Sequence, residues 1–358
     1  MLADIAVEFM FESLVFSRDR AEGLVQTLQD ETSGPRLARW VRRIDIKSNN
    51  PDPICQNIAR LHLPNLQVQC VFESFLEPLP IMPPHHSLHT IVMDYSLLPS
   101  LPSSYPDVFQ RLRALTIIIK GMEQEERPPI DNLVGPNLFQ LTIIAVCSAP
   151  ALVINCISAI GSTSHPNLTC LTLHLYEQRG EHIRPLISWI TRIGVQLQHF
   201  TITAVNSTNI TAADLRKVLS SCPNLTELVM SAVKDIASAS AADYVHAKLQ
   251  TLGLPLEHSN EKRNRSTYSR MISIFSQKGV FPMMKTMRIT RVENGLICEG
   301  LVGNTLAAEW LRPHAICLLE IGIALEDGHG EDIRQALTGD RHLQDSEAER
   351  GNDTQTAV

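Results

Sequence analysis

The sequence contains few aromatic residues and no long apolar run. Phe, Trp and Tyr make up 5% of its 358 residues, and no uninterrupted apolar stretch reaches the ~18 residues of a membrane-spanning helix. Asp4 and Glu8 interrupt the apolar residues at the beginning, and no basic region precedes them, so a secretory signal is not expected. We therefore expect an intracellular protein, cytoplasmic or nuclear, that does not bind a membrane.

Short motifs of common enzyme classes are also missing. The chain has no Gly-x-Ser-x-Gly, no P-loop, no His-Glu-x-x-His and no glycine run of a dinucleotide-binding site. The pair His85 and His86 follows two prolines in an expected loop, which does not suggest a metal site. We expect no enzymatic activity, no cofactor and no metal. A catalytic site would require residues that are distant in the sequence.

The eight cysteines include no Cys-x-x-Cys pair and no tight cluster. This spacing favours buried free thiols over a disulfide framework or a zinc site.

The chain is mildly acidic, with a net charge of −7 and an isoelectric point near 6.0. This balance argues against a nucleic-acid-binding protein. One basic cluster stands out, formed by Arg36, Arg39, Arg42 and Arg43. It has two interpretations, a solvated strand edge with its loop or a contact for an acidic partner.

The tripeptide Pro-Asn-Leu occurs four times, beginning at Pro64, Pro136, Pro166 and Pro223. The composition would produce only about 0.1 copies by chance, so the motif indicates internal repetition. From the second copy onward it introduces a short apolar segment of one design.

These segments share apolar residues at the first, fourth and sixth positions. The pattern alone is common in a chain that is 44% apolar, but its central copies recur every 24 to 30 residues, an interval typical of leucine-rich repeats. Each copy is expected to form a strand. The clearest copies begin at Leu112, Leu138, Leu168, Leu197, Leu225 and Leu249, and weaker copies begin at Phe11, Val41, Leu88, Met284 and Ile316.

Several segments between the strands carry helix signals. Thr211 is a suitable N-cap for a helix with an apolar stripe of Leu215, Val218 and Leu219. Helices are also expected over 151–160, 181–193 and 266–275, whereas the proline-rich stretches 76–86 and 99–106 favour irregular loops. Strands joined by helices imply a parallel sheet. The expected fold is an α/β leucine-rich-repeat solenoid, with a curved parallel sheet on its concave side and helices and irregular returns on its convex side.

Two stretches resemble a known family. Residues 211–231, TAADLRKVLSSCPNLTELVMS, follow the order helix, Cys-Pro-Asn-Leu turn and strand. Residues 5–29 and 38–46, the latter with Trp-Val-Arg-Arg, resemble the passage that follows an F-box. The chain thus resembles fungal, basidiomycete-type F-box proteins with degenerate repeats of the ribonuclease-inhibitor type. The resemblance covers roughly residues 11 to 328.

This resemblance implies a function in protein recognition. In the family, the repeats bind the protein to be ubiquitinated, and the F-box, a helical bundle usually opening with Leu-Pro, docks on the adaptor of a cullin ubiquitin ligase. Residues 1–10 are expected to be at most the final helix of such a bundle, either because the sequence is truncated or because this part was lost. We therefore expect a protein partner or ubiquitination substrate, but no adaptor binding. The alternative is a repeat protein unrelated to ubiquitination, such as a scaffold or a small-GTPase regulator, with Arg43 as the candidate arginine.

Three segments are expected along the chain: an N-terminal helical capping segment over 1–38, the repeat array over 39–328 and a polar, disordered tail over 329–358. The register is ambiguous around residues 61–71. The core stripe of that repeat is either Leu63, Leu66 and Val68, which we prefer, or a stripe in which Gln69 takes an apolar position.

Strand alternation predicts a working surface. Because the motif positions point into the core, the intervening residues point to the concave face. Threonine, isoleucine and tyrosine also favour strands wherever they lie, so this composition has a second, purely structural explanation. The candidate protein-binding residues are Ile118, Gln140, Thr142, Ile144, Thr172, His174, Tyr176, His199, Thr201 and Thr203.

Overall fold

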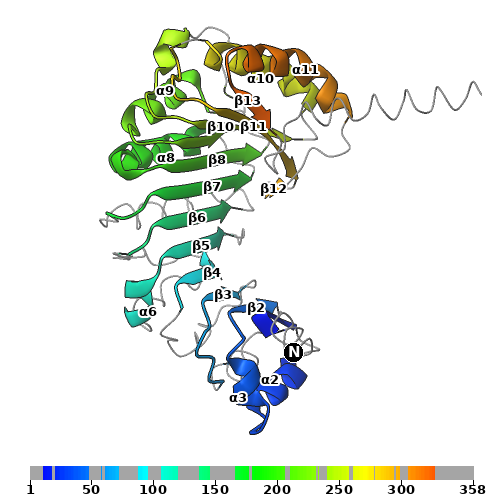
Figure 1. Ribbon diagram of the computed structural model, residues 1–358. Helices are drawn as coiled ribbons and strands as arrows, with labels where there is room; N and C mark the ends of the chain where they lie inside the picture. The colour runs from blue at the N-terminus through cyan, green and yellow to red at the C-terminus, as the bar shows by residue number, and fades with distance from the viewer. Residues whose placement is uncertain are drawn as a thin grey trace, which may run out of the picture. The chain divides into compact units, whose positions relative to one another are not determined.

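The structure is a computed structural model with two compact units, Met1–Gln178 (unit 1) and Arg179–Val358 (unit 2). Both units are of the α/β class, with parallel strands joined by helices and loops (Figure 1). It describes residues 11–17, 21–47, 58, 61–71, 88–95, 106–119, 137–145, 166–176, 180–205, 210–230, 233, 240–257, 261–277, 279–293, 296–298 and 305–326.

The described residues of unit 1 include seven strands that pair in chain order, each parallel to the next. They are β1 (Ser13–Ser17), β2 (Arg43–Lys47), β3 (Val68–Val71), β4 (Thr90–Asp94), β5 (Ala114–Ile119), β6 (Gln140–Ala145) and β7 (Cys170–Tyr176). The described helices are α2 (Ala21–Gln29), α3 (Gly34–Ala38) and α6 (Pro106–Arg111). Since β1 pairs with β2, the expected capping segment 1–38 contributes a strand to the sheet.

Unit 2 continues the same design. The strands β8 (His199–Val205), β9 (Glu227–Met230), β10 (Thr251–Glu257) and β11 (Thr286–Glu293) pair in parallel and in chain order. Strand β13 (Ala324–Glu326) pairs in parallel with the first half of β11, and β12 (Leu296–Cys298) pairs antiparallel with its second half.

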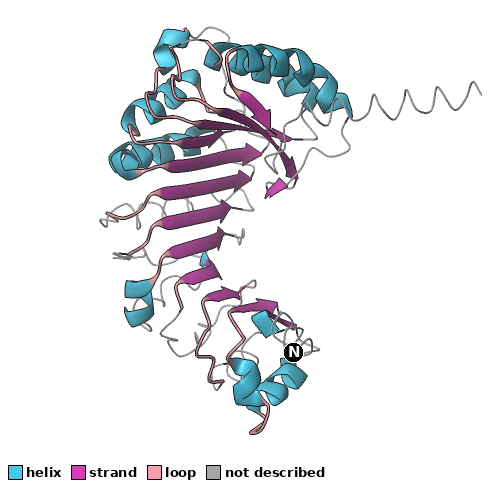
Figure 2. Ribbon diagram, in the orientation of Figure 1, coloured by secondary structure: helices cyan, strands magenta, loops and turns pink. Residues whose placement is uncertain are grey.

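Helices accompany the strands of unit 2, as Figure 2 shows in cyan. Helix α8 (Gly180–Ile193) packs against α9 (Ala212–Ser221), and α10 (Glu261–Phe275) packs against α11 (Thr305–Glu320). The described part of unit 2 also contains the short 3-10 helices η2 (Gly194–Gln196) and η4 (Ala241–Tyr244). None of the helices in the described part of the chain has the length and apolar character that a membrane crossing requires.

The apolar positions of the predicted pattern form the core. In the six clearest copies, from Leu112 to Leu249, all three apolar side chains are at most 3% exposed. Removing such a stripe from water is the main favourable term in folding, and one repeat cannot bury it without its neighbours. The predicted strand ladder is confirmed for these copies.

One backbone arrangement recurs where the strands start. The N–H groups of Gln67 and Val68 both donate to the carbonyl of Arg42, at 2.8 and 3.0 Å, and the carbonyl of Gln67 accepts in turn from His89 and Thr90. The same pairing continues through Arg113 and Phe139 in unit 1 and through Thr226, Gln250 and Lys285 in unit 2. Successive repeats therefore share one strand-start geometry.

The Pro-Asn-Leu motif connects neighbouring repeats. In three of its copies, the Asn side chain (Asn65, Asn137 or Asn224) donates at 2.7 Å to a carbonyl 26 to 29 residues earlier. The leucine that follows is at most 3% exposed in all four copies. The asparagine thus satisfies a carbonyl of the preceding turn while the leucine begins the core stripe.

The repeat after Asn224 replaces the motif with His-Ala-Lys-Leu. There, Lys248 Nζ donates to Asn224 Oδ1 at 2.6 Å, so the lysine extends the series of side-chain contacts. His246 is 4% exposed, its Nε2 bonds the carbonyl of Cys222, and its Nδ1 accepts from the N–H of Leu249. This bonding requires the tautomer with hydrogen on Nε2.

Predicted helices agree with the structure wherever the residues are described. Thr211 and Asp214 form a capping box at the start of α9, in which each side chain accepts from the other residue's backbone N–H. Helix α8 covers the expected 181–193, and α10 begins at Glu261, five residues before the expected start. The predicted helix over 151–160, the loop over 76–86 and the tail lie outside the described residues.

The preferred register of β3 is wrong. Strand pairing aligns Gln69 with Ile44 on one side and Ile91 on the other, and Gln69 is 3% exposed. Val68 points to the opposite face and is partly exposed. A shift by one residue exchanges the two faces of a strand, so the neighbours' apolar positions determine the register even though a glutamine then enters the core.

The strand predicted from Ile316 is also wrong. Ile316, Leu319 and Ile321 lie at the end of α11 and just beyond it, and they are 54%, 48% and 49% exposed. The buried stripe of this helix is Leu311, Ala315 and Leu318, at helical spacing. The strand follows only at β13.

The prediction of buried thiols holds for Cys70 and Cys222. It is wrong for Cys317, which is exposed on α11, while Cys170 is partly exposed. All four are free.

Candidate functional site

Unit 1 presents a second sheet face opposite its core stripe. The residues between the buried positions of β4 to β7 point to it, and every one of those whose side chain is described is partly exposed. We call this surface the outer face of unit 1. It consists of Thr90, Val92, Ala114, Thr116, Ile118, Gln140, Thr142, Ile144, Cys170, Thr172 and His174.

The strand register arranges the outer face in rows. A middle row places Thr116, Thr142 and Thr172 beside one another on β5, β6 and β7. A second row, nearer the strand ends, aligns Ile118, Ile144 and His174. Neighbouring strands lie ~4.8 Å apart, so each row brings three side chains into contact range.

This face is apolar with hydroxyl groups. Burial lowers the pKa of His174 below its ordinary value of 6.5, so the imidazole is uncharged at neutral pH. The described residues of the outer face therefore carry no charge at pH 7. A face with isoleucine and histidine beside threonine hydroxyls provides apolar contact area and hydrogen bonds, the combination found in protein interfaces.

The structure brings six of the ten predicted site residues together on this face. They are Ile118, Gln140, Thr142, Ile144, Thr172 and His174. Tyr176 is the last residue of β7, and its side chain lies outside the described part.

The remaining three predicted residues lie on β8 in unit 2. His199 is exposed and Thr201 is partly exposed. Thr203 is 1% exposed, so the prediction that it belongs to an accessible face is wrong. Strand alternation gives the direction of a side chain but not what covers it.

Toward β2 the middle row of unit 1 changes character. Asp45 and Cys70 continue it, but they are 8% and 1% exposed. Arg43 Nε donates to Asp45 Oδ1 at 2.9 Å, and this bond, the largest cause, raises the pKa of Arg43. The arginine proposed for a GTPase regulator is therefore held against its own sheet by Asp45.

The outward residues of unit 2 form a charged network. Glu227 on β9 bonds His199 on β8, with Oε2 and Nδ1 3.1 Å apart, and its Oε1 lies 3.9 Å from Arg288 NH1. Arg288 NH2 on β11 also bonds Glu326 Oε2 on β13 at 3.3 Å. All four side chains are between 22% and 47% exposed, so each pair contributes little to stability.

A glycine shapes this part of the sheet. Gly253 on β10 lies between Val229 and Arg288 in the register, and a Cβ at this position would lie 2.6 Å from Val229 Cγ2. The glycine therefore leaves space that the Val229 side chain fills.

The predicted site includes His199 of this network but not Glu227, Arg288 or Glu326. Alternation places Glu227 and Arg288 outward, but their proximity follows only from the register of three strands. Glu326 was missed because its strand was predicted around Ile316. Opposite charges on adjacent outward positions would have been the usable signal.

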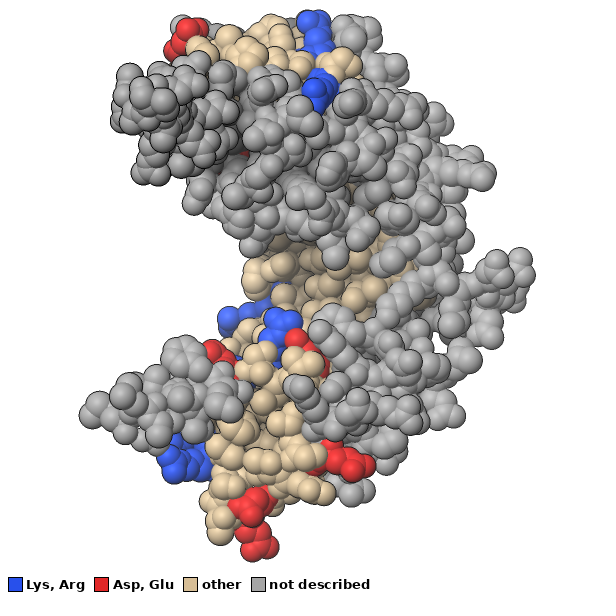
Figure 3. Space-filling model, turned by 90° about the vertical axis from the view of Figure 1, so that its right-hand side faces the viewer, with Lys and Arg blue, Asp and Glu red and all other residues tan. Residues whose placement is uncertain are grey.

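Charges of both signs occur on the visible surface of the molecule. In Figure 3 small groups of Lys and Arg side chains and of Asp and Glu side chains of the described residues are scattered over this face, and near its middle the two kinds lie next to each other. Among the described residues no three His, Cys, Asp or Glu side chains gather as metal ligands.

Neither a scan against models of known protein families nor a search of curated proteins finds a match for this chain.

Proposed function

We propose that this chain is a non-catalytic protein-recognition module built from leucine-rich repeats, similar to the substrate-binding region of a fungal F-box protein. The observation that carries the proposal is the outer face of unit 1, where rows of threonine and isoleucine lie partly exposed across β5, β6 and β7. Sheet faces made of successive repeats provide extended binding surfaces in solenoid proteins.

The composition of the outer face favours a protein partner over a small molecule. The described residues of the outer face carry no charge, and they include no cluster of titratable groups that could catalyse a reaction. Apolar rows with hydroxyls at their margin suit a protein surface that buries both. The resemblance adds that the bound protein is a ubiquitination substrate.

A crosslinking experiment tests the binding surface. The photoreactive amino acid p-benzoylphenylalanine replaces Thr142 on the outer face, and in a matched variant it replaces Gln26, an exposed residue of α2 in the same unit. We expect one protein to be crosslinked from Thr142 and not from Gln26, and Thr142→Arg to abolish its binding while Gln26→Arg does not. Equal crosslinking from both positions, or none from Thr142, would contradict the proposed surface.

Whether the bound protein is a ubiquitination substrate needs a separate measurement. The ubiquitination and half-life of the crosslinked protein are compared in cells with the native chain, with Thr142→Arg and without the chain. A longer half-life in the last two supports substrate recognition for a ligase. An unchanged half-life, with binding intact, favours a scaffold.

A further inference from the structure

Unit 1 has an exposed surface beside its outer face, where the strands begin. The residues that precede β2, β3, β4 and β5 form a row linked by backbone hydrogen bonds: the carbonyl of Arg42 accepts from Gln67, that of Gln67 from His89, and that of His89 from Arg113. Three strand spacings of ~4.8 Å place Arg42 and Arg113 about 14 Å apart.

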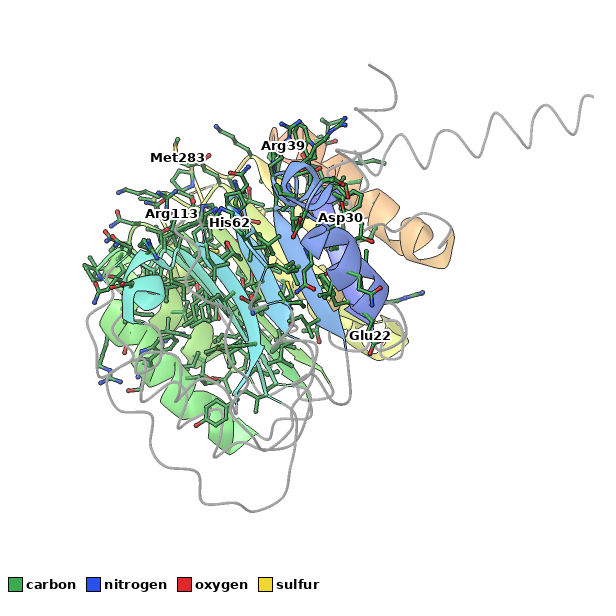
Figure 4. All side chains as sticks on the ribbon, turned by 90° about the horizontal axis from the view of Figure 1, so that it is seen from below. Glu22, Asp30, Arg39, His62, Arg113 and Met283 are labelled. Atoms are coloured by element: carbon green, nitrogen blue, oxygen red, sulfur yellow. The ribbon has the colours of Figure 1, made fainter. Side chains whose placement is uncertain are left out.

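The neighbouring turn adds further groups to this row. The Asn65 side chain donates to the carbonyl of Arg39, which places the turn with His62 and Asn65 next to Arg39. The Arg39 guanidinium carbon lies 4.7 Å from the centroid of the Trp40 ring, a cation–π contact that orients the charge. Figure 4 labels Arg39, His62 and Arg113, with Asp30 on the other side of Arg39 and Glu22 farther away.

Four arginines lie at or near this row, and two of them have no ion-pair partner among the described residues. Arg42 is paired with Glu12 at 3.5 Å, and Arg43 with Asp45. Arg39 and Arg113 are exposed, and no described acidic side chain forms an ion pair with either. His62 and Gln67, also exposed, add hydrogen-bond donors between them.

We propose that this edge, formed by Arg39, His62, Gln67 and Arg113, binds an extended acidic segment of a protein partner. A stretch of about four to five extended residues spans the ~14 Å between the backbones of Arg42 and Arg113. Carboxylates of such a segment accept paired hydrogen bonds from the guanidinium groups of Arg39 and Arg113. The side chains of His62 and Gln67 donate to the backbone carbonyls of the segment. The inference rests on the proposed function in that the partner is a protein.

A nucleic acid fits this edge less well. Single-stranded nucleic-acid sites stack bases on aromatic side chains, and the indole ring of Trp40 is already covered by the Arg39 guanidinium.

The test uses the full chain and a fluorescein-labelled hexaglutamate peptide, with binding measured by fluorescence anisotropy at about 50 and about 300 mM NaCl. The double variant Arg39→Gln with Arg113→Gln should bind at least about fivefold more weakly. The control is Arg192→Gln with Lys217→Gln, which removes the same charge from α8 and α9 of unit 2. It should change binding by less than about twofold.

Several outcomes would overturn the inference. Absence of peptide binding at low salt, an equal loss in both double variants, or equal binding of hexalysine would each exclude a specific acidic-segment site. A six-nucleotide DNA that binds more tightly than the peptide and loses affinity with the same variant would replace it with a nucleic-acid site. Thr142→Arg separates the two proposals: if it abolishes the crosslinked partner while no peptide binds to the edge, the outer face stands and this inference falls.

Discussion

The Asn224 side chain reaches back 29 residues to the carbonyl of Val195, to which its amide nitrogen donates at 2.7 Å. Asn65 and Asn137 make the same bond to Arg39 and Gln110. Because the bond connects one repeat to the turn of the repeat before it, it stabilises the stacking of neighbours rather than any repeat alone.

Replacing this asparagine should weaken the array. Asn224→Ala leaves the carbonyl of Val195 without its donor and removes the acceptor of Lys248 Nζ, so we expect a loss of ~1 kcal/mol in the free energy of unfolding. Urea unfolding followed by circular dichroism measures it. Gln198→Ala, which removes an exposed amide one strand away, is the control and should change stability by less than ~0.5 kcal/mol. Equal effects would show that the bond contributes nothing specific.

Gln69 is a polar residue in an apolar stripe. Its Oε1 is buried and has no hydrogen-bond partner in the described structure, and its strand neighbours are Ile44 and Ile91. Gln69→Leu should therefore stabilise the protein, by about 1 kcal/mol, because an unpaired buried oxygen is removed. The urea midpoint measures the change, and the exposed Gln67→Leu serves as the control. A destabilised Gln69→Leu protein would mean that the amide has a structural role.

The cysteines should differ strongly in reactivity. Burial raises the pKa of Cys222 to about 12, whereas Cys317 is exposed on α11. Since the thiolate is the reactive form, iodoacetamide at about pH 8 should modify Cys317 at least ~100-fold faster than Cys222. Mass spectrometry of peptides after timed alkylation measures the ratio. In denaturing urea the two rates should become similar, and a persistent difference there would point to local sequence instead of burial.

Stability should fall on acidification. The folded-state pKa of His174 lies below 6.5 because of burial, so the unfolded chain binds more protons as the pH drops past that value. The free energy of unfolding therefore decreases from pH 6.5 downward until the folded state is also protonated. Comparing urea midpoints at pH 7.5 and pH 5 should show a smaller decrease in His174→Phe than in Thr172→Val, a neighbour that does not titrate. The same decrease in both variants would assign the acid sensitivity to other groups.

The repeat pattern predicted most strands because their apolar spacing is strict and their interval is regular. It failed where one of these two signals was missing. Around residues 61–71 the apolar spacing admits two registers, and only pairing with Ile44 and Ile91 places Gln69 in the core. At Ile316 the same three-residue pattern occurs at the end of a helix, where the first and fourth positions lie about one helical turn apart and the sixth lies beyond Glu320, the last helical residue.

The candidate site depended on the same limits. Alternation alone predicted the outward rows around Thr142 and Ile144, since side chains of a strand point to opposite faces. It could not show that Thr203 is covered, because burial depends on neighbours from other parts of the chain. Nor could it join Glu227, Arg288 and Glu326, whose contact spans three different strands.

The sequence by itself determined the strand interval, the core stripe and the Pro-Asn-Leu turns, because these depend on local spacing and on residue chemistry within one repeat. Only the tertiary structure decided the register of β3, the helix at Ile316, and which side chains lie together on the outer face of unit 1 and in the charged network of unit 2. Those features depend on which side chains of neighbouring repeats compete for the same buried space, and a single repeat does not contain that information.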